Sequence, residues 1–592
     1  MCTSCNTSSP SLTPGQLADV RERGDQELAR LGYDRRQILS AGAALAAAAG
    51  LSALGAADAH AAPAKARGGA PQELTWLVGD HHVHTQYSHD AKYTIPMQLD
   101  AAERFGVDWL AFTEHSNVAH ADRGVFAHLE EIRRERRRRD LLIFQGIEWY
   151  IPAAEHGTVF VHPGENEARL LRAFELAWDG KLNGWEKPAV GSAAEAEQQQ
   201  KAAAAIAWLG DQVRQGTVAD ALVLANHPMR LGIDSPAEMR RWRDADRTIM
   251  IGMEGSPGAQ GYPAGKNVGP GDQRGEYVNK PRPDSWPGYT LDMYRPYGGF
   301  DWMTASVGGL WDSMLAEGLP FFITANSDNH LTAWDTRRIG DYPNREPYTS
   351  LPQEFDRWSV EGKRPDPVDT GVPQGGSDYW PGQFSRIHTG VTERSYGAVM
   401  EAMRAGRMWV DHGHLLAGLD VHVSASQPGR GLGRGRGHGH GWGNASGQAV
   451  TLGGTLTAQR GQDVTVTVTV TTTDTPNSAG ILPQPAHVDI IGGPITGPVA
   501  DRDSCRAPGT RVLKAFDTTG RRGTFTLTHT FRDVQESFYV RFRGSDGKRN
   551  GAGYFGADVD PHGPIRHGDE VGDGNPWIDT WFYANPVFVQ VA

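Results

Sequence analysis

Short apolar runs recur along the first two thirds of the chain, and stretches with helical periodicity separate them. The runs have the length and the β-branched or aromatic content of buried strands. They are LTWLV (74–78), VDWLAF (107–112), LLIFQGI (141–147), ALVLA (221–225), TIMIGM (248–253) and PFFITA (320–325). Apolar residues three to four positions apart predict helices in PMQLDAAERFG, AHLEEIRRERRRR, the segment 190–216 and GLWDSMLAEG. Strands that alternate with helices predict a parallel sheet.

Each of these apolar runs leads directly into histidine, aspartate or glutamate. The first run is followed by GDHHVHTQYSHD (79–90). An extended backbone would point His82 and His84 of this stretch to the same side. The carboxyl ends of parallel strands converge on one face of a βα-barrel, so residues far apart in sequence meet there. We therefore expect one cluster built from His82, His84, Glu114, His115, Glu148, His227, Glu254, Asp328 and His330.

The last third of the chain alternates apolar and polar residues, with turn residues and no helical pattern between the runs. QDVTVTVTVTTT, GTFTLTHTF, SFYVRFRG and PVFVQVA predict a β-sandwich. We expect the aromatic stretch NPWIDTWFYANPVFV to pack this sandwich against the barrel. The predicted fold is thus an α/β barrel over 71–415, a Gly/Arg/His-rich linker or loop over 416–447 and an all-β sandwich over 448–592.

Composition excludes several classes of function. The 592 residues carry 58 basic and 70 acidic side chains, a net charge of −12, which offers no basic field for nucleic acid. The basic run RRERRRRD (133–140) fits a solvated helix face. Of three cysteines only Cys505 follows the N-terminal segment, which rules out a disulfide framework or a thiolate metal site there. The acidic residues from Asp558 to Asp573 lack EF-hand spacing and are interpreted as a solvated loop.

The N-terminal segment DRRQILSAGAALAAAAGLSALGAADAHAAPA indicates export. Its arginine pair, weakly apolar alanine-rich stretch and small-residue ending resemble a twin-arginine signal peptide. Asp34 and Ile38 depart from the usual residues of that motif. We predict a signal over 1–61 with cleavage after Ala61, folded export by the twin-arginine machinery, and a secreted chain. The stretch is too poor in Leu, Ile, Val and Phe to favour a stable membrane span.

The strand-end residues, taken in order, resemble the motifs of the polymerase and histidinol phosphatase (PHP) family of metallophosphoesterases. The resemblance covers 71–415. The matching segments are His82-x-His84-Thr85 with Ser88 and Asp90, Thr113-Glu114-His115-Ser116, Gly146-x-Glu148, His156-Gly157, Asn226-His227-Pro228 and Ser327-Asp328-x-His330.

The resemblance implies a distorted barrel of about seven βα units and two or three divalent metal ions. By motif, one metal site would comprise His82, His84, Glu148 and Asp328. A second would comprise Glu148, His156 and His227, with Glu148 bridging the two. A third would comprise Asp90, His115 and His330. His162 competes with His156 for its position, and His89 competes with Asp90.

Imidazole and carboxylate ligands without thiolate suit zinc, manganese or iron. Paired metals acidify a shared water into a bridging hydroxide and stabilise a phosphoryl displacement, so no serine or cysteine nucleophile is needed. The predicted activity is hydrolysis of small-molecule phosphate mono- or diesters, with Glu148 and Asp328 central. Arg230 is the candidate phosphate contact, against a plain surface arginine. Glu254 is either a residue that supports the ligands or an acid at the barrel mouth.

Two alternatives stay open. An amidohydrolase-type barrel also begins with an HxH pair, so the same metals could serve carbamate, amide or ester hydrolysis. In the other alternative the metals are purely structural and the protein binds a cell-wall or glycan partner. Long Gly-, Pro- and aromatic-rich loops at 255–300 and 331–383 follow ligand-bearing strands and should overhang the metal face.

Overall fold

The computed structural model describes residues 12–34, 73–185, 188–256, 258, 281–294, 299–339, 362–374, 376, 378–426, 449–547 and 580–592. Several predicted features lie outside these residues. They are the signal segment from Arg35 to Ala61, most of the 255–300 loop, residues 340–361 of the 331–383 loop, the Gly-rich stretch from 427, and the acidic loop around Asp558.

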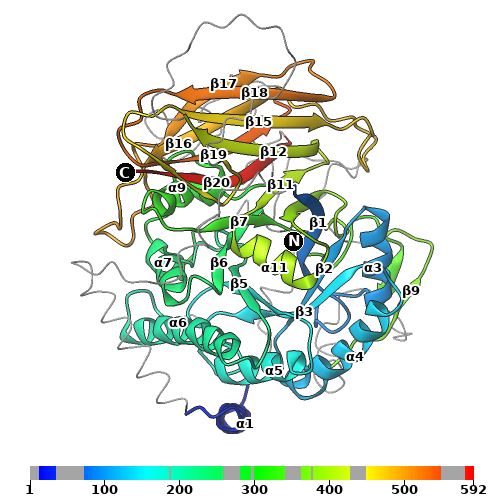
Figure 1. Cartoon of the computed structure of the whole chain (residues 1–592). Helices are drawn as coiled ribbons and strands as arrows, with labels where there is room; N and C mark the ends of the chain where they lie inside the picture. The colour runs from blue at the N-terminus through cyan, green and yellow to red at the C-terminus, as the bar shows by residue number, and fades with distance from the viewer. Residues whose placement is uncertain are drawn as a thin grey trace, which may run out of the picture.

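Seven strands in the order β1 to β7 form the barrel-like part of one long sheet (Figure 1). Strands β1, β2 and β3 pair in parallel, and so do β5, β6 and β7. Strand β4 runs antiparallel to both of its neighbours. The parallel-rich α/β fold is confirmed, whereas β4 was not predicted. The strands are β1 (Thr75–Val83), β2 (Trp109–His115), β3 (Leu142–Tyr150), β4 (His156–Val161), β5 (Ala221–Ala225), β6 (Met250–Ser256) and β7 (Phe322–Ala325).

The connecting helices lie around the outside of these strands (Figure 1). Short polar side chains cap several of them: Thr94 accepts from the third helical N–H of α3, and Ser235 with Glu238 forms a capping box on α7. The helices are α3 (Ile95–Arg104), α4 (Val125–Arg136), α5 (Glu167–Trp178), α6 (Ala193–Arg214), α7 (Pro236–Ala245), α8 (Trp302–Ala305), α9 (Leu310–Leu315) and α11 (Tyr396–Arg404), with short turns η1 (His120–Gly124) and η2 (Leu291–Tyr294).

The chain after β7 returns to the first strand at the carboxyl edge. The backbone N–H of His84 donates to the carbonyl of Asn329 at 3.1 Å, next to an isolated parallel bridge between Val83 and Asn329. On the same edge, away from β2, the earlier part of β1 pairs antiparallel with β10 (Ser385–Val391), which pairs with β11 (Met408–His412). A separate two-stranded antiparallel sheet pairs β8 (Arg337–Ile339) with β9 (Pro367–Asp369). The contact at Asn329 therefore holds the end of the last barrel strand beside the HxH pair.

The C-terminal region is a sandwich of two sheets, as predicted, but one sheet is continuous with the barrel. Strand β20 pairs antiparallel with β11, which places Trp409 opposite Ala584. The aromatic C-terminal stretch thus joins the two parts, as expected. That sheet contains β14 (Thr455–Ala458), β16 (His487–Pro494), β17 (Arg511–Asp517), β19 (Phe538–Ser545) and β20 (Trp581–Val591); the other contains β12 (Leu416–Ala425), β13 (Ala449–Val450), β15 (Val464–Thr472) and β18 (Thr524–Phe531).

The predicted linker over 416–447 is wrong in its first part. Strand β12 pairs with β15 along almost its whole length and buries Leu419, Val421 and Val423. Its alternation LAGLDVHVSA is the strand pattern of the sandwich, but it stands immediately before the Gly-rich stretch and was assigned with it. The sandwich therefore begins at residue 416.

A buried ion pair ties the sandwich to a barrel helix. Arg541 on β19 donates from Nε and Nη2 to the two carboxylate oxygens of Asp312 on α9, at 2.6 and 2.7 Å. Neither side chain is exposed, and the Tyr539 hydroxyl donates to the same carboxylate at 3.0 Å. The guanidinium lies 4.8 Å from the ring centre of Trp311. The two parts consequently share polar contacts as well as a sheet.

Helix α1 (Pro14–Arg30) lies before the arginine pair and packs on α5. Val20 and Leu28 are buried in this contact. Part of the predicted signal peptide is therefore a helix docked on the barrel, which the prediction of a single signal over 1–61 did not anticipate. Within the described residues, no helix combines the length and apolar character needed to cross a membrane.

Candidate metal centre

The structure brings all the predicted ligands together at the carboxyl edge of the barrel strands. Strand β4 delivers its first residue to this edge because it runs antiparallel to its neighbours. Every ligand is at most 8% exposed. The gathered residues are His82, His84, Asp90, His115, Glu148, His156, His227, Asp328 and His330.

Four of these residues present ligand atoms at metal-binding separations. His82 Nε2 lies 3.0 Å from His84 Nε2 and 3.1 Å from Asp328 Oδ1. Each histidine also has a Glu148 oxygen at 3.4 Å. Ligands in a tetrahedron with metal bonds of about 2.0–2.1 Å would be separated by about 3.3–3.4 Å. The residues predicted for the first site therefore fit a divalent ion.

Glu148 is the centre of the cluster. Its Oε1 lies 2.8 Å from His156 Nδ1 and 2.9 Å from His227 Nε2, while its Oε2 lies 3.0 Å from His115 Nδ1. The resemblance implied that Glu148 would bridge the first two sites. The geometry extends this role, since Glu148 also reaches His115 of the third.

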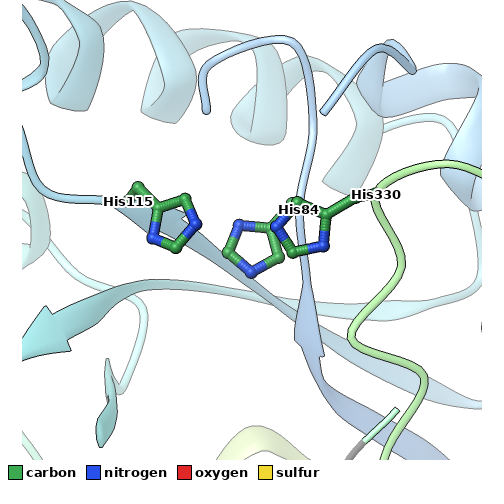
Figure 2. A group of neighbouring side chains, drawn as sticks. All are labelled: His84, His115 and His330. Carbon is green, nitrogen blue, oxygen red and sulfur yellow. The ribbon is translucent and has the colours of Figure 1, made fainter. Parts of the chain in front are cut away.

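The third group lies beside the first. Figure 2 shows the rings of His84, His115 and His330 gathered together; His84 directly follows β1, His115 ends β2, and His330 lies in the segment after β7. The His84 and His330 rings stack at 3.8 Å, and Asp90 Oδ2 lies 3.3 Å from His115 Nε2. These histidines form a group that could hold an ion, and His89, Asp90 and His115 form another. Both His89 and Asp90 therefore reach this edge of the site.

The competitor of His156 is placed elsewhere. His162 follows the far end of β4, where its Nδ1 lies 2.9 Å from the carbonyl of Pro163 and its ring contacts Tyr396. His156 instead lies among the ligand atoms. The geometry therefore favours His156 for the second site.

Burial and mutual charge set the protonation of the cluster. Burial alone would raise the pKa of Glu148, but His156, His82 and His115 hold it well below its usual range. Burial would lower the pKa of His330, but Asp90 and Asp328 raise it to about 9. The carboxylates are therefore ionised at neutral pH, and in the absence of metal a proton occupies His330.

Two ligands have strained backbones. His227 has φ +30° and Asp328 has φ +45°, in the left-handed region that residues with a Cβ rarely adopt. Such strain persists only where the surroundings impose it, and it concentrates at functional sites. The backbone here is held so that these two side chains turn into the cluster.

Supporting acids orient the imidazoles. Glu254 Oε1 lies 2.7 Å from His82 Nδ1, and its Oε2 accepts from the backbone N–H of His227 at 2.7 Å. Glu114 accepts from the Ser88 hydroxyl at 2.6 Å, and that hydroxyl lies 2.9 Å from His84 Nδ1. Partners of this kind fix the ring orientation and tautomer of metal-binding histidines. Glu254 is thus a supporting residue, the first of the two predicted alternatives.

Arg230 is buried, so its interpretation as a plain surface residue is wrong. Its Nη2 donates to Glu155 Oε2 at 3.0 Å, and that carboxylate lies 3.7 Å from His227 Nδ1. The role of Arg230 as a phosphate contact stays a prediction; the geometry favours holding Glu155 beside His227. Sequence reasoning missed Glu155, although its position directly before His156 was the available signal.

Residues 80–230 match the family model described as PHP domain. This segment is similar to a PHP domain. The match includes seven of the nine predicted ligands, from His82 to His227, and Asp328 and His330 lie beyond the matched segment. No curated protein matches the chain. One similar solved structure is described as a two-domain protein containing a predicted PHP-like metal-dependent phosphoesterase from Bacteroides vulgatus, with 12% identity, TM-score 0.27 and coverage of 83% of this chain and 94% of that one.

Proposed function

We propose that this chain is a metal-dependent phosphoesterase that hydrolyses small-molecule phosphate esters with two or three divalent ions in its PHP domain. The observation that carries the proposal is the position of Glu148, whose two oxygens reach histidines of all three ligand groups. Two ions that shared this carboxylate as a ligand would supply the paired charge that two-metal hydrolysis uses.

Bound divalent ions would supply an acidified water and positive charge toward the phosphoryl oxygens. The chain's own contribution is to hold the ligands rigidly. Glu254 and the Glu114–Ser88 pair fix the outer nitrogens of His82 and His84, so both Nε2 atoms face the cluster. Burial excludes bulk water from the ligands and strengthens their electrostatic interactions.

Export remains part of the proposal. The support is the arginine pair, alanine-rich stretch and small-residue ending of the N-terminal segment. Replacing Arg35 and Arg36 with lysine should retain the chain inside the producing cell, as measured by fractionation. Equal secretion of the substituted and original chains would contradict twin-arginine export.

The decisive experiment measures hydrolysis of an aryl phosphomonoester and a bis-aryl phosphodiester by the full chain loaded with manganese or zinc. The variants Glu148→Gln and Asp328→Asn should lose turnover and bound metal. His162→Asn is the matched control, because His162 lies at the far end of β4.

Carbamate and amide substrates form the second arm of this experiment. Metal-dependent turnover of those substrates alone would replace the phosphoesterase proposal with an amidohydrolase-like activity on the same ligands. Tight metal binding without turnover of any substrate would favour the non-catalytic binding protein instead.

A further inference from the structure

A pocket of about 400 Å³ lies between α3 and the segment that follows His330. This volume falls within the range of about 300–1,000 Å³ that small-molecule sites have. One wall is the face of α3 that carries Asp100 and Arg104, the other wall is the segment 332–337, and Trp380 lies beside them. None of the lining residues is a predicted metal ligand, so the pocket is separate from the ligand cluster.

Trp334 stands in the second wall on a strained backbone. Its φ of +60° lies in the left-handed region, which bulky side chains rarely adopt. Strain of this kind persists only where the surroundings impose it, and it concentrates at functional sites. The side chain is nevertheless 54% exposed, so the fold gains little burial from this conformation. The strain therefore serves to present the indole ring at the pocket.

Both neighbours of Trp334 are anchored. The backbone N–H of Ala333 donates to the carbonyl of Asp378 at 3.0 Å. The Tyr93 hydroxyl donates to the Asp335 carboxylate at 3.0 Å. These hydrogen bonds hold the backbone on either side of the tryptophan, so the surroundings that impose its conformation are part of the folded barrel.

Trp380 offers the pocket a second indole ring. Its ring centre lies 4.3 Å from that of Tyr93 at an interplanar angle of 44°, and its backbone N–H donates to Gln383 Oε1 at 2.9 Å. The residue is half-buried, so part of it faces solvent. Phe105 is a further aromatic residue of the lining. Aromatic rings of this kind provide a large rigid surface for the apolar faces of a ligand.

The charges of the lining balance. Two aspartates, Asp100 and Asp335, and two arginines, Arg104 and Arg337, line the pocket. Arg337 Nη1 lies 3.1 Å from Asp335 Oδ1, and Arg139 Nη2, outside the lining, lies 2.7 Å from Asp100 Oδ1. Opposite charges at these separations cancel much of each other's field. The pocket therefore favours an uncharged ligand over a strongly anionic or cationic one.

The polar groups of the lining combine donors and acceptors. Carboxylate oxygens accept hydrogen bonds, guanidinium N–H groups donate them in a planar fork, and the hydroxyls of Thr332 and Thr336 do both. A saccharide has the matching chemistry, because its hydroxyls donate and accept while the C–H faces of its rings are apolar. A planar aromatic ligand would stack on the indoles but would leave most of these polar groups unused.

We propose that this pocket binds a neutral saccharide, with Trp334 and Trp380 against the ring faces and Asp100 and Arg104 bonded to hydroxyls. The inference goes beyond the proposed function and does not depend on it, since the pocket contains no metal ligand. A saccharide bound here would hold the chain on a glycan whether or not the metal centre hydrolyses phosphate esters.

The test measures binding to the full chain by calorimetry. The probes are four neutral oligosaccharides, cellohexaose, chitohexaose, xylohexaose and maltohexaose, together with adenosine as a planar aromatic ligand. At least one oligosaccharide should bind, and it should bind more tightly than adenosine. Binding of adenosine alone would overturn the inference, and so would binding of none of the five probes.

Trp334→Gly separates a role in binding from a role in the fold. Glycine adopts positive φ without strain, so Tm should stay the same or rise. Saccharide affinity should fall at least about tenfold, because truncation removes an aromatic anchor. Trp334→Tyr should keep part of the affinity, since a smaller ring still stacks. A lower Tm with unchanged affinity would show that the tryptophan serves the fold, against the inference.

Leu291→Ala is the matched control. Leu291 is 55% exposed, close to the exposure of Trp334, and it lies in η2 outside the pocket lining. Arg104→Met keeps the aliphatic stem and removes the N–H donors, so it should weaken saccharide binding by a smaller factor than Trp334→Gly does. If Trp334→Gly binds the saccharide as well as Leu291→Ala does, the sugar is held elsewhere on the chain and the inference fails.

Discussion

The ion pair between barrel and sandwich gives a quantitative prediction. Asp312→Asn keeps the shape of the side chain and removes its charge, leaving the Arg541 guanidinium without a balancing carboxylate. Neither side chain has exposed surface, so solvent cannot screen the uncompensated charge. Removal of one partner from a buried pair typically costs about 3–5 kcal/mol.

The double variant separates charge from packing. Asp312→Leu with Arg541→Met removes both charges, which is often close to neutral. However, Asp312 also accepts from the Tyr539 hydroxyl at 3.0 Å and the Gly308 N–H at 2.7 Å. Each buried donor left without its acceptor costs about 1–3 kcal/mol. We therefore expect the double variant to recover part of the loss and to remain less stable than the original chain.

Urea unfolding monitored by fluorescence and circular dichroism measures these differences. Arg532→Met is the surface control, because the Arg532 side chain is 80% exposed where it pairs with Asp463 and such pairs contribute about 0–1 kcal/mol. A loss for Asp312→Asn no larger than that of Arg532→Met would refute the reasoning. So would a loss that disappears at high salt, since a buried pair is barely screened.

Three further predictions concern the metals. Glu254→Gln should weaken metal binding about 10–100-fold, because the glutamine has no charge with which to fix the His82 ring. Titration with a competing chelator measures this change. Unchanged affinity would show that Glu254 does not support the ligands. Metal loading at pH 7 should release protons, seen by calorimetry in two buffers, because neighbouring carboxylates raise the pKa of His330 to about 9 and also raise the pKa values of His82 and His115. Metal affinity should therefore rise with pH above neutrality, and zero proton release would contradict this. Metal at a hundredfold excess over Kd should stabilise the fold by about 2.7 kcal/mol, raising Tm, and a chelator should reverse the shift.

Much of the site could be predicted because its residues follow strands in a repeated way. Apolar runs identified the six parallel strands, and parallel strands bring their carboxyl ends to one edge. The sequence therefore predicts that His82, Glu148 and Asp328 lie together. The order of motifs then indicated which histidines group with which carboxylates.

The remaining features depend on tertiary contacts that leave weak traces in sequence. Strand β4 is short and antiparallel, and only its pairing with β3 and β5 shows why His156 occupies the metal edge while His162 does not. The contact between Arg230 and Glu155 joins side chains 75 residues apart, which no local pattern encodes. Strand β12 was missed because the neighbouring glycines dominated the interpretation of its alternation.

Because α1 is docked on the barrel, it limits how far the arginine pair can extend from the folded chain. Only the segment Leu31–Asp34 separates the end of α1 from Arg35, and its four residues span at most about 14 Å when fully extended. An export receptor that binds Arg35 and Arg36 would therefore have to contact the folded barrel or separate α1 from α5. If the segment is a signal peptide as proposed, cleavage after Ala61 would remove α1 together with it and expose the face of α5 that α1 covers.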